Sequence, residues 1–175
     1  GLGVAENIVS LRKHQHGMGK VTLFPTELDV PVSEVKYSNE ELKRLLSLDI
    51  QKTFSRTALL GMLAAREAVD DARLDLNTLR VGLISSTSVG GMDLSEHFYN
   101  AFKKDNRKGR LREVISHDCG ASTEMIADYL KVNDFVTTIS TACSSAANAI
   151  MLGARMIRNG QLDAAIVGGT DALCR

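Results

Sequence analysis

One cysteine of this sequence lies where nucleophilic chemistry is favoured. Cys143 follows a β-branched apolar stretch, residues 135–140, that predicts a buried strand, and it opens an Ala-rich stretch to residue 158 that predicts a helix. The positive end of a helix dipole stabilises a thiolate, and the free N–H groups of a first turn can bind a developing oxyanion. Two interpretations stay open from position alone: a nucleophile, or a buried structural cysteine, since free cysteines are often buried.

The segments around Cys143 predict an α/β fold. Strands are expected at 79–86, 135–140 and 164–169, and helices at 55–72, 93–103, 122–131 and 143–158. These strands lack polar alternation and are joined by helices, which favours a mostly parallel sheet covered by helices. The carboxyl end of a strand in such a sheet is where ligands bind, so the position of Cys143 suits a substrate site.

The start of the sequence and the helix ends give weaker patterns. Residues 4–13 predict a short amphipathic helix, and 17–47 predict a loop-rich segment that ends in a polar helical stretch at 39–46. Ser122 or Thr123 is expected to cap the helix at 122–131. Asn159-Gly160 is expected to end the helix that starts at Cys143, because glycine takes the left-handed conformation at little cost.

Composition excludes several classes of protein. The 175 residues are expected to form one domain, and 44% hydrophobic with 24% charged residues is typical of a globular chain. Lys plus Arg and Asp plus Glu both number 21, so the zero net charge disfavours non-specific nucleic-acid binding. No apolar run approaches the roughly 18–20 residues of a membrane span. Cysteines at 119, 143 and 174 have unrelated spacings, which argues against a disulfide framework or a metal site and favours a reducing, cytoplasmic location.

The segment Thr141-Ala142-Cys143-Ser144-Ser145-Ala146 resembles the active-site cysteine motif of β-ketoacyl-[acyl-carrier-protein] synthases, the elongating condensing enzymes of fatty-acid and polyketide assembly. Residues 54–68, 81–91 and 160–172 resemble further segments of that family, in the same order and spacing. The resemblance implies a thiolase-like fold of two similar α/β halves, of which residues 1–175 form the N-terminal half. We expect the family's first strand and its C-terminal half, which carries two catalytic histidines, to be absent from this sequence.

The resemblance also implies roles for individual residues. Cys143 would accept an acyl chain as a thioester from acyl carrier protein, and malonyl carrier protein would then lose carbon dioxide and attack that thioester. Val89, just before Gly90-Gly91, matches the family position that gates the acyl pocket. Lys52 and Arg56 lie near the start of the helix that resembles a carrier-docking region. No cofactor or metal is implied, since the carrier protein brings its own phosphopantetheine, and without the histidines we expect these residues alone to be inactive.

The same resemblance implies a homodimer, or a heterodimer with a synthase-like subunit, in which the strand 135–140 pairs with the partner's copy. Three alternatives stay open. One is a non-catalytic, acyl-binding chain-length partner subunit, and another is a thiolase-type enzyme that acts on coenzyme A thioesters. The third is a cysteine-dependent acyl hydrolase, for which His117 is the only base offered. The basic run 103–110 is interpreted as a solvated loop, with docking of an acidic carrier as the alternative.

Overall fold

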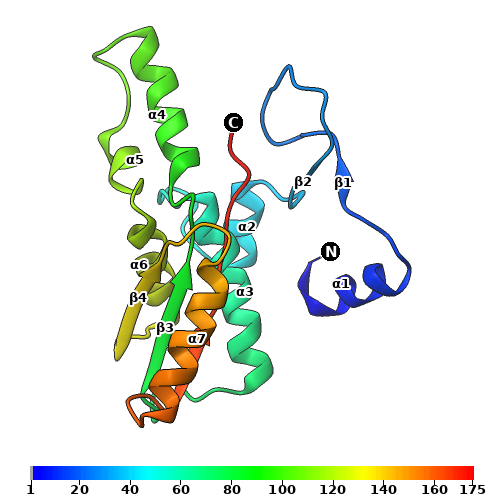
Figure 1. Ribbon diagram of the computed structural model, residues 1–175. Coiled ribbons are helices and arrows are strands. Elements are labelled where there is room, and N and C mark those ends of the chain that lie inside the picture. The colour runs from blue at the N-terminus through cyan, green and yellow to red at the C-terminus, as the bar shows by residue number, and fades with distance from the viewer. Residues whose placement is uncertain (1) are drawn as a thin grey trace.

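A three-stranded parallel sheet lies at the centre of the molecule (Figure 1). The computed structural model describes residues 2–175. β3 (Val81–Ser86) is the middle strand, and β4 (Phe135–Ile139) and β5 (Ala164–Val167) pair with it on either side, both in parallel. Every residue of β3 is buried, which explains why its sequence, including Ser85 and Ser86, does not alternate between apolar and charged side chains. The predicted α/β class with a mostly parallel sheet is therefore confirmed.

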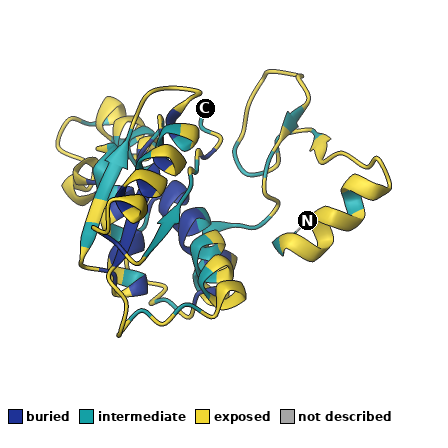
Figure 2. Ribbon diagram, turned by 60° about the horizontal axis from the view of Figure 1, so that its bottom comes forward, coloured by how far each residue is buried: buried dark blue, intermediate teal, exposed yellow. Residues whose placement is uncertain are grey.

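Helices cover both faces of the sheet. They are α3 (Arg56–Ala72) and α6 (Cys119–Leu130) on one face, and α7 (Ser145–Arg158) on the other. Leu83 belongs to the core formed with α3 and α6, whereas its neighbour Ile84 belongs to the core formed with α7. Because successive strand side chains point to opposite faces, β3 supplies both cores, and the buried residues in Figure 2 follow this division.

The N-terminal segment lies to one side of this body (Figures 1 and 2). It comprises α1 (Gly3–Arg12) and the strands β1 (Met18–Gly19) and β2 (Val32–Ser33), whereas the next helix, α2 (Asn39–Leu45), packs against α3 and contributes Leu42 to the core. The antiparallel β1–β2 pair was not predicted, because strands of two residues produce no periodicity in the sequence. Helix α1 contains no buried residue. Helix α2 begins with a capping box between Ser38 and Glu41, which satisfies two backbone N–H groups at once.

Two helix starts differ from the prediction. Helix α6 begins at Cys119 and is capped by Asp118, whose carboxylate accepts a hydrogen bond from the backbone N–H of Gly120 at 2.6 Å. Ser122 and Thr123 are instead buried within the helix, so the prediction that one of them is the cap was wrong. Their hydroxyls contact Ser55 and Thr138, respectively, across the core. Helix α7 begins at Ser145, two residues later than expected.

The arm between β3 and α6 is held by close backbone contact. It contains α4 (Met92–Lys104) and the unpredicted five-residue helix α5 (Leu111–Ile115). A side chain at Gly91 would place its Cβ 1.8 Å from the carbonyl oxygen of Ser116, which follows α5. Gly90 has a φ of 56°, and a Cβ there would lie 2.7 Å from the carbonyl oxygen of His117. The Gly-Gly pair therefore lets the turn after β3 lie directly against the backbone before α6.

At the end of the sheet where the strands begin, Arg80 and Asp163 join the starts of β3 and β5. The Arg80 guanidinium donates to both carboxylate oxygens of Asp163, at 2.7 and 3.0 Å, and to the carbonyl of Gly160. The side-chain hydrogen bonds from Arg80, followed by its backbone N–H, lower the pKa of Asp163 to about 2. Gly160 has a φ of 68°, as expected for the residue that ends α7.

We predict that Asp163→Asn destabilises the protein in a pH-dependent way. The folded-state pKa of Asp163 is lowered from 3.8 to about 2, so its contribution is present above pH 4 and is lost as the pH falls towards 2. Urea unfolding should therefore show a difference between wild type and variant at pH 5 that shrinks at lower pH. The Asp71→Asn change at an exposed position is the matched control and should leave the free energy of unfolding at pH 5 close to that of wild type. A difference that stays constant from pH 5 to pH 2.5 would contradict the role given to this ion pair.

We also predict that Gly91→Ala lowers the free energy of unfolding by about 1–3 kcal/mol, the usual cost of overpacking. The added methyl group meets a backbone carbonyl, which cannot rotate away as a side chain could. Gly168→Ala is the control, because its Cβ would meet no atom within 4 Å. Equal unfolding midpoints in urea for the two variants would show that the contact at Gly91 is not tight.

Candidate functional site

The carboxyl ends of the three strands lie together at one end of the sheet, which we call its carboxyl edge. Each strand runs on into a turn or extension, and these carry Val89 after β3, Cys143 after β4 and Asp171 after β5. Open α/β sheets bind ligands at this edge. The three residues therefore share the place where a substrate site is expected, although they are 28 to 82 positions apart in the sequence.

Backbone hydrogen bonds continue the sheet into this edge. The N–H of Thr87 donates to the carbonyl of Ile139 at 3.3 Å, which joins the turn after β3 to the end of β4. The N–H of Thr170 donates to the carbonyl of Ser86 at 2.9 Å, which holds the extension of β5 beside the end of β3. The turns that carry the candidate residues are thus fixed to one another by the backbone.

The turn before α7 contains a strained residue. Ala142 has a φ of 53°, in the left-handed region, which costs a residue with a side chain about 1–2 kcal/mol. This turn places Cys143 one residue before the N-cap Ser144, and the cysteine is exposed and free. The expectation that the helix opens at Cys143 was therefore wrong by two residues. The thiol still lies next to the N-terminus of α7, at the carboxyl end of β4.

A network of hydroxyl groups holds this turn in its conformation. Ser145 accepts a hydrogen bond from the N–H of Thr141 at 2.8 Å and donates to the carbonyl of Ala142 at 2.7 Å. Ser144 donates to the carbonyl of Thr141 at 2.8 Å, and the Asn148 amide donates to the Thr141 hydroxyl at 2.9 Å. Strained backbone persists where surrounding contacts determine it in this way, most often at functional sites.

An exposed thiol beside a helix N-terminus, at the ligand-binding edge of the sheet, can act as a nucleophile. The other two cysteines are partly buried. Cys119 lies 3.9 Å from the hydroxyl of Ser140 at the end of β4. Burial, with a smaller effect of Glu96, raises the pKa of Cys174 to about 11, so its thiol is a poor nucleophile at neutral pH. Solvent exposure therefore distinguishes Cys143 from Cys119 and Cys174.

The structure gives His117 a partner other than Cys143. Its Nδ1 atom lies 2.9 Å from the hydroxyl of Ser95 on α4, and its carbonyl faces the Gly90 turn. The acyl-hydrolase alternative needed His117 as the base for Cys143, and this geometry directs the ring towards α4 instead. The remaining histidines, His14, His16 and His97, are exposed, as expected.

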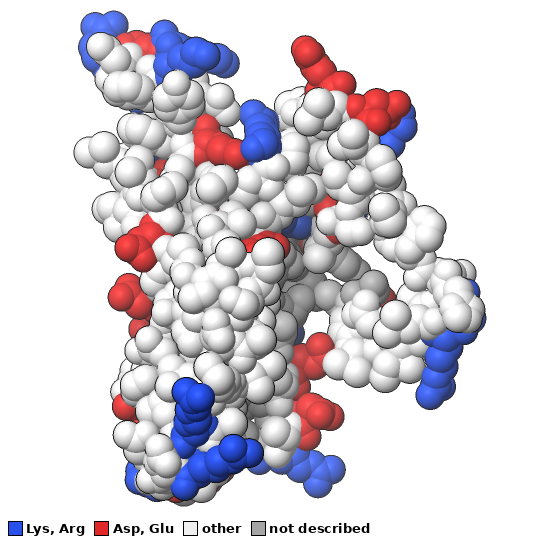
Figure 3. All heavy atoms as spheres, viewed as in Figure 1, with Lys and Arg blue, Asp and Glu red and all other residues white. Residues whose placement is uncertain are grey.

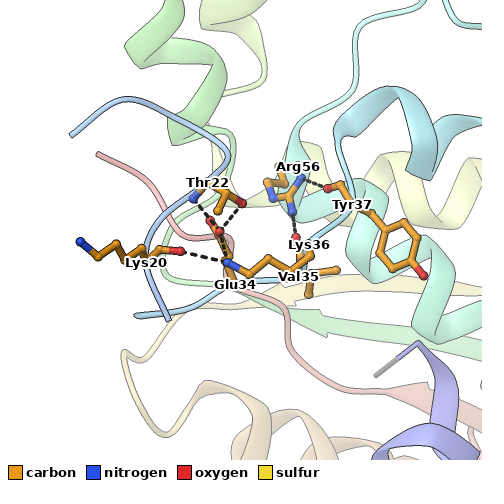
Figure 4. Close-up of polar contacts among 7 residues, drawn as sticks. All are labelled: Lys20, Thr22, Glu34, Val35, Lys36, Tyr37 and Arg56. Carbon is orange, nitrogen blue, oxygen red and sulfur yellow. Dashed lines mark hydrogen bonds and ion pairs between the residues drawn. The ribbon is translucent and has the colours of Figure 1, made fainter. Parts of the chain in front are cut away.

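Arg56 is not available for docking, which corrects the prediction made for it. Its side chain is buried, with the residue 7% exposed. Its guanidinium donates to the carbonyls of Val35 and Tyr37, at 2.6 and 2.9 Å (Figure 4). It also donates to the side chain of Asn39. Arg56 therefore anchors the segment before α2 to the start of α3. The other predicted docking residue, Lys52, is exposed.

The segment anchored by Arg56 is also held by a covered carboxylate. Burial alone would raise the pKa of Glu34, but hydrogen bonds from Lys36 and Thr22 outweigh it and lower the pKa to about 2 (Figure 4). Lys36 also donates to the carbonyl of Lys20, which joins the residues after β1 to those after β2. No pattern in the sequence predicts this cluster, because it depends on contacts between segments of an irregular loop.

Exposed basic side chains gather at the far end of α4 (Figure 3). They are Lys103, Lys104, Arg107, Lys108 and Arg110. Asp105 pairs locally with Arg107 and Lys108, so part of this charge is neutralised within the loop.

Within residues 2–175, no three His, Cys, Asp or Glu side chains are grouped so that they could hold a metal ion. No helix in this part of the chain is both long enough and apolar enough to cross a membrane.

Comparison with known proteins points to one family. The ketoacyl synthase alpha subunit of tetracenomycin polyketide synthase from Streptomyces glaucescens is 29% identical over 136 residues, covering 69% of this chain and 30% of that protein. The 3-oxoacyl-[acyl-carrier-protein] synthase 2 of Staphylococcus aureus is 28% identical over 169 residues, covering 91% of this chain and 41% of that one. The chain thus spans 30% to 41% of the length of these curated relatives.

A solved structure shows the same fold. The structure titled "The ishigamide ketosynthase/chain length factor" superposes with a TM-score of 0.87 at 26% identity, over 100% of this chain and 45% of that one. The expected thiolase-like α/β fold is therefore confirmed. Residues 29–175 match the family model described as the N-terminal domain of β-ketoacyl synthases. The chain belongs to the β-ketoacyl synthase family.

Proposed function

We propose that the complete protein is a β-ketoacyl-[acyl-carrier-protein] synthase of fatty-acid or polyketide synthesis, and that Cys143 carries its acyl intermediate. The observation that carries the proposal is the exposed thiol of Cys143, which follows a strained residue and precedes α7 at the carboxyl edge of the sheet. The relatives named as ketoacyl synthases in both pathways support the reaction class.

In the proposed first step, the Cys143 sulfur attacks the carbonyl carbon of an acyl thioester. The new S–C bond forms as the carbonyl electron pair moves to oxygen, and the backbone N–H of Cys143 donates to that oxyanion. The oxyanion then collapses and expels the carrier thiolate, which takes up the proton released from Cys143. The acyl chain remains on Cys143 as a thioester. The positive end of α7 stabilises the negative charge at each stage.

In the second step, malonyl carrier protein loses carbon dioxide, and the resulting carbanion attacks the acyl carbon on Cys143. The S–C bond breaks, the Cys143 thiolate leaves, and a β-ketoacyl chain two carbons longer is formed. The groups that assist decarboxylation are proposed to come from two histidines elsewhere in the complete protein. Residues 2–175 therefore supply the cysteine that holds the acyl group. We expect them to be inactive in condensation by themselves.

Partners follow from the same proposal. The edge strand β4 pairs only with β3 among the described residues, and Val136 on it is 37% exposed. We propose that the unpaired side of β4 contacts a second copy of this protein or a synthase-like subunit. The similar solved structure, titled as a ketosynthase with a chain length factor, supports this proposal. Exposed Lys52 is proposed to meet the acidic surface of acyl carrier protein, where charge complementarity raises the rate of encounter.

The first functional prediction concerns Cys143. Incubation of the complete protein with an acyl carrier thioester should raise the mass of the peptide containing Cys143 by the mass of the acyl group. Cys143→Ala should abolish this increase, whereas Cys119→Ser should retain it. Acyl coenzyme A tested in parallel distinguishes the thiolase-type alternative, which would use it in preference to the carrier thioester. Rapid release of free acid without an acyl-enzyme would favour a hydrolase instead, and an unreactive thiol would favour the partner-subunit alternative.

The second functional prediction concerns Val89. If this partly buried residue limits the acyl pocket, Val89→Phe should shift the accepted chains to shorter lengths by filling space near the turn. We expect about a tenfold loss in kcat/KM for the longest accepted chain, with little change for the shortest. Val89→Ile adds a single methylene and is the graded control. A chain-length profile unchanged in both variants would remove Val89 from the pocket.

A further inference from the structure

We propose that Asp171 is a positioning residue that fixes the turn 87–90 and thereby sets the chain-length limit imposed by Val89. A single carboxylate oxygen, Oδ1 of Asp171, accepts three hydrogen bonds from this turn. They come from the Thr87 hydroxyl at 2.7 Å, the Ser88 N–H at 2.8 Å and the Val89 N–H at 3.3 Å. The inference rests on the proposed acyl-binding function, because Val89 matters only if an acyl chain passes it.

The Thr87 hydroxyl connects Asp171 to the rest of the turn through hydrogen bonds. Its side chain is buried, and its hydroxyl accepts hydrogen bonds from the N–H groups of Val89 at 3.1 Å and Gly90 at 3.0 Å. A hydroxyl has one hydrogen, and here Asp171 receives it, so the lone pairs of the oxygen face the turn. The carboxylate thus holds the N–H of Ser88 directly and, through the orientation of Thr87, the N–H groups of Val89 and Gly90.

The other side of the turn packs closely against the backbone before α6. Positions 90 and 91 lie against the carbonyl oxygens of Ser116 and His117, with no room for a Cβ at either position. Asp171 is itself fixed, since the preceding Thr170 is hydrogen-bonded to Ser86. The turn is therefore clamped between the backbone before α6 and the carboxylate after β5. Of these two contacts, only the carboxylate can be removed without disturbing the backbone packing.

A clamped turn gives Val89 one position, and a fixed side chain imposes a sharp limit on the chains that fit beside it. A charged acceptor suits this task, because hydrogen bonds to a carboxylate are roughly twice as strong as those between neutral groups. When the carboxylate is lost, the N–H groups of Ser88 and Val89 lose their shared acceptor. The turn then has room to shift away from α6, and longer chains gain access.

The test uses the complete protein and three variants: Asp171→Ala, the conservative Asp171→Asn, and Asp71→Ala as an exposed control far from the edge. Acylation of Cys143 is measured for a series of carrier thioesters of increasing length. Asp171→Ala should raise the kcat/KM ratio of the longest to the shortest chain by about tenfold, in the range expected for lost charged hydrogen bonds. Asp171→Asn keeps one oxygen acceptor and should fall between wild type and Asp171→Ala.

Amide hydrogen exchange provides a measurement that does not depend on activity. The amides of Ser88 and Val89 should exchange faster in Asp171→Ala and close to wild type in Asp71→Ala. Val89→Phe should also lose most of its effect on chain length when combined with Asp171→Ala, because the bulky side chain is no longer held in place. Non-additivity of this kind is expected only if the two residues act through one turn.

The possible results distinguish a failure of this inference from a failure of the proposed function. Wild-type protein that does not acylate Cys143 would overturn the proposed function and, with it, the role of Val89. Wild-type acylation with an unchanged chain-length profile in Asp171→Ala would overturn the positioning role alone. Unchanged exchange at Ser88 and Val89 would show that Asp171 does not hold the turn. Faster exchange together with the altered profile is the result that we expect.

Discussion

The parallel alignment of three strands is the constraint on which the site depends. β3 pairs with β4 from Gly82↔Phe135 to Ser86↔Ile139, and with β5 from Val81↔Ala164 to Ile84↔Val167. Because all three strands run in the same direction, the residues that follow them emerge at one edge. Were one strand reversed, the residue that follows it would lie at the opposite end of the sheet. The cores on both faces of β3 maintain the alignment, so packing far from Cys143 determines where its thiol lies.

Strain at this edge is maintained by polar contacts that connect neighbouring segments. Ala142 keeps a left-handed backbone because the Ser145 hydroxyl accepts from the N–H of Thr141 and donates to the carbonyl of Ala142. The Gly90 turn keeps its close approach to α6 because Thr87 and Asp171 satisfy its N–H groups. In both places, a hydroxyl group receives a backbone N–H on one side and donates to an oxygen on the other. This arrangement holds two turns rigidly beside a sheet edge that must stay open to substrate.

The sequence was informative where local pattern decides structure and uninformative where tertiary contacts decide it. Apolar and β-branched stretches without polar alternation correctly predicted the three strands, and the motif around Cys143 correctly indicated the family. The start of α7 could not be predicted, since nothing in the sequence marks Ala142 as left-handed. Arg56 was predicted to contact the carrier protein because it lies near the start of a helix that resembles a carrier-docking region, and only the folded chain brings the carbonyls of Val35 and Tyr37 to it. Asp171 lay within a segment used to identify the family, but its contacts to residues some 80 positions earlier have no sequence signature.

The most direct test is a crystal structure of the complete protein in which Cys143 has been alkylated with a long-chain iodoacetamide. This reagent places an acyl-like chain on the sulfur without requiring turnover. We predict that the chain runs from the Cys143 sulfur along the carboxyl edge of the sheet and contacts Val89, with the turn 87–90 still bonded to Asp171. A chain that leaves this edge without meeting Val89, or a Cys143 that resists alkylation in the folded protein, would contradict the proposed site.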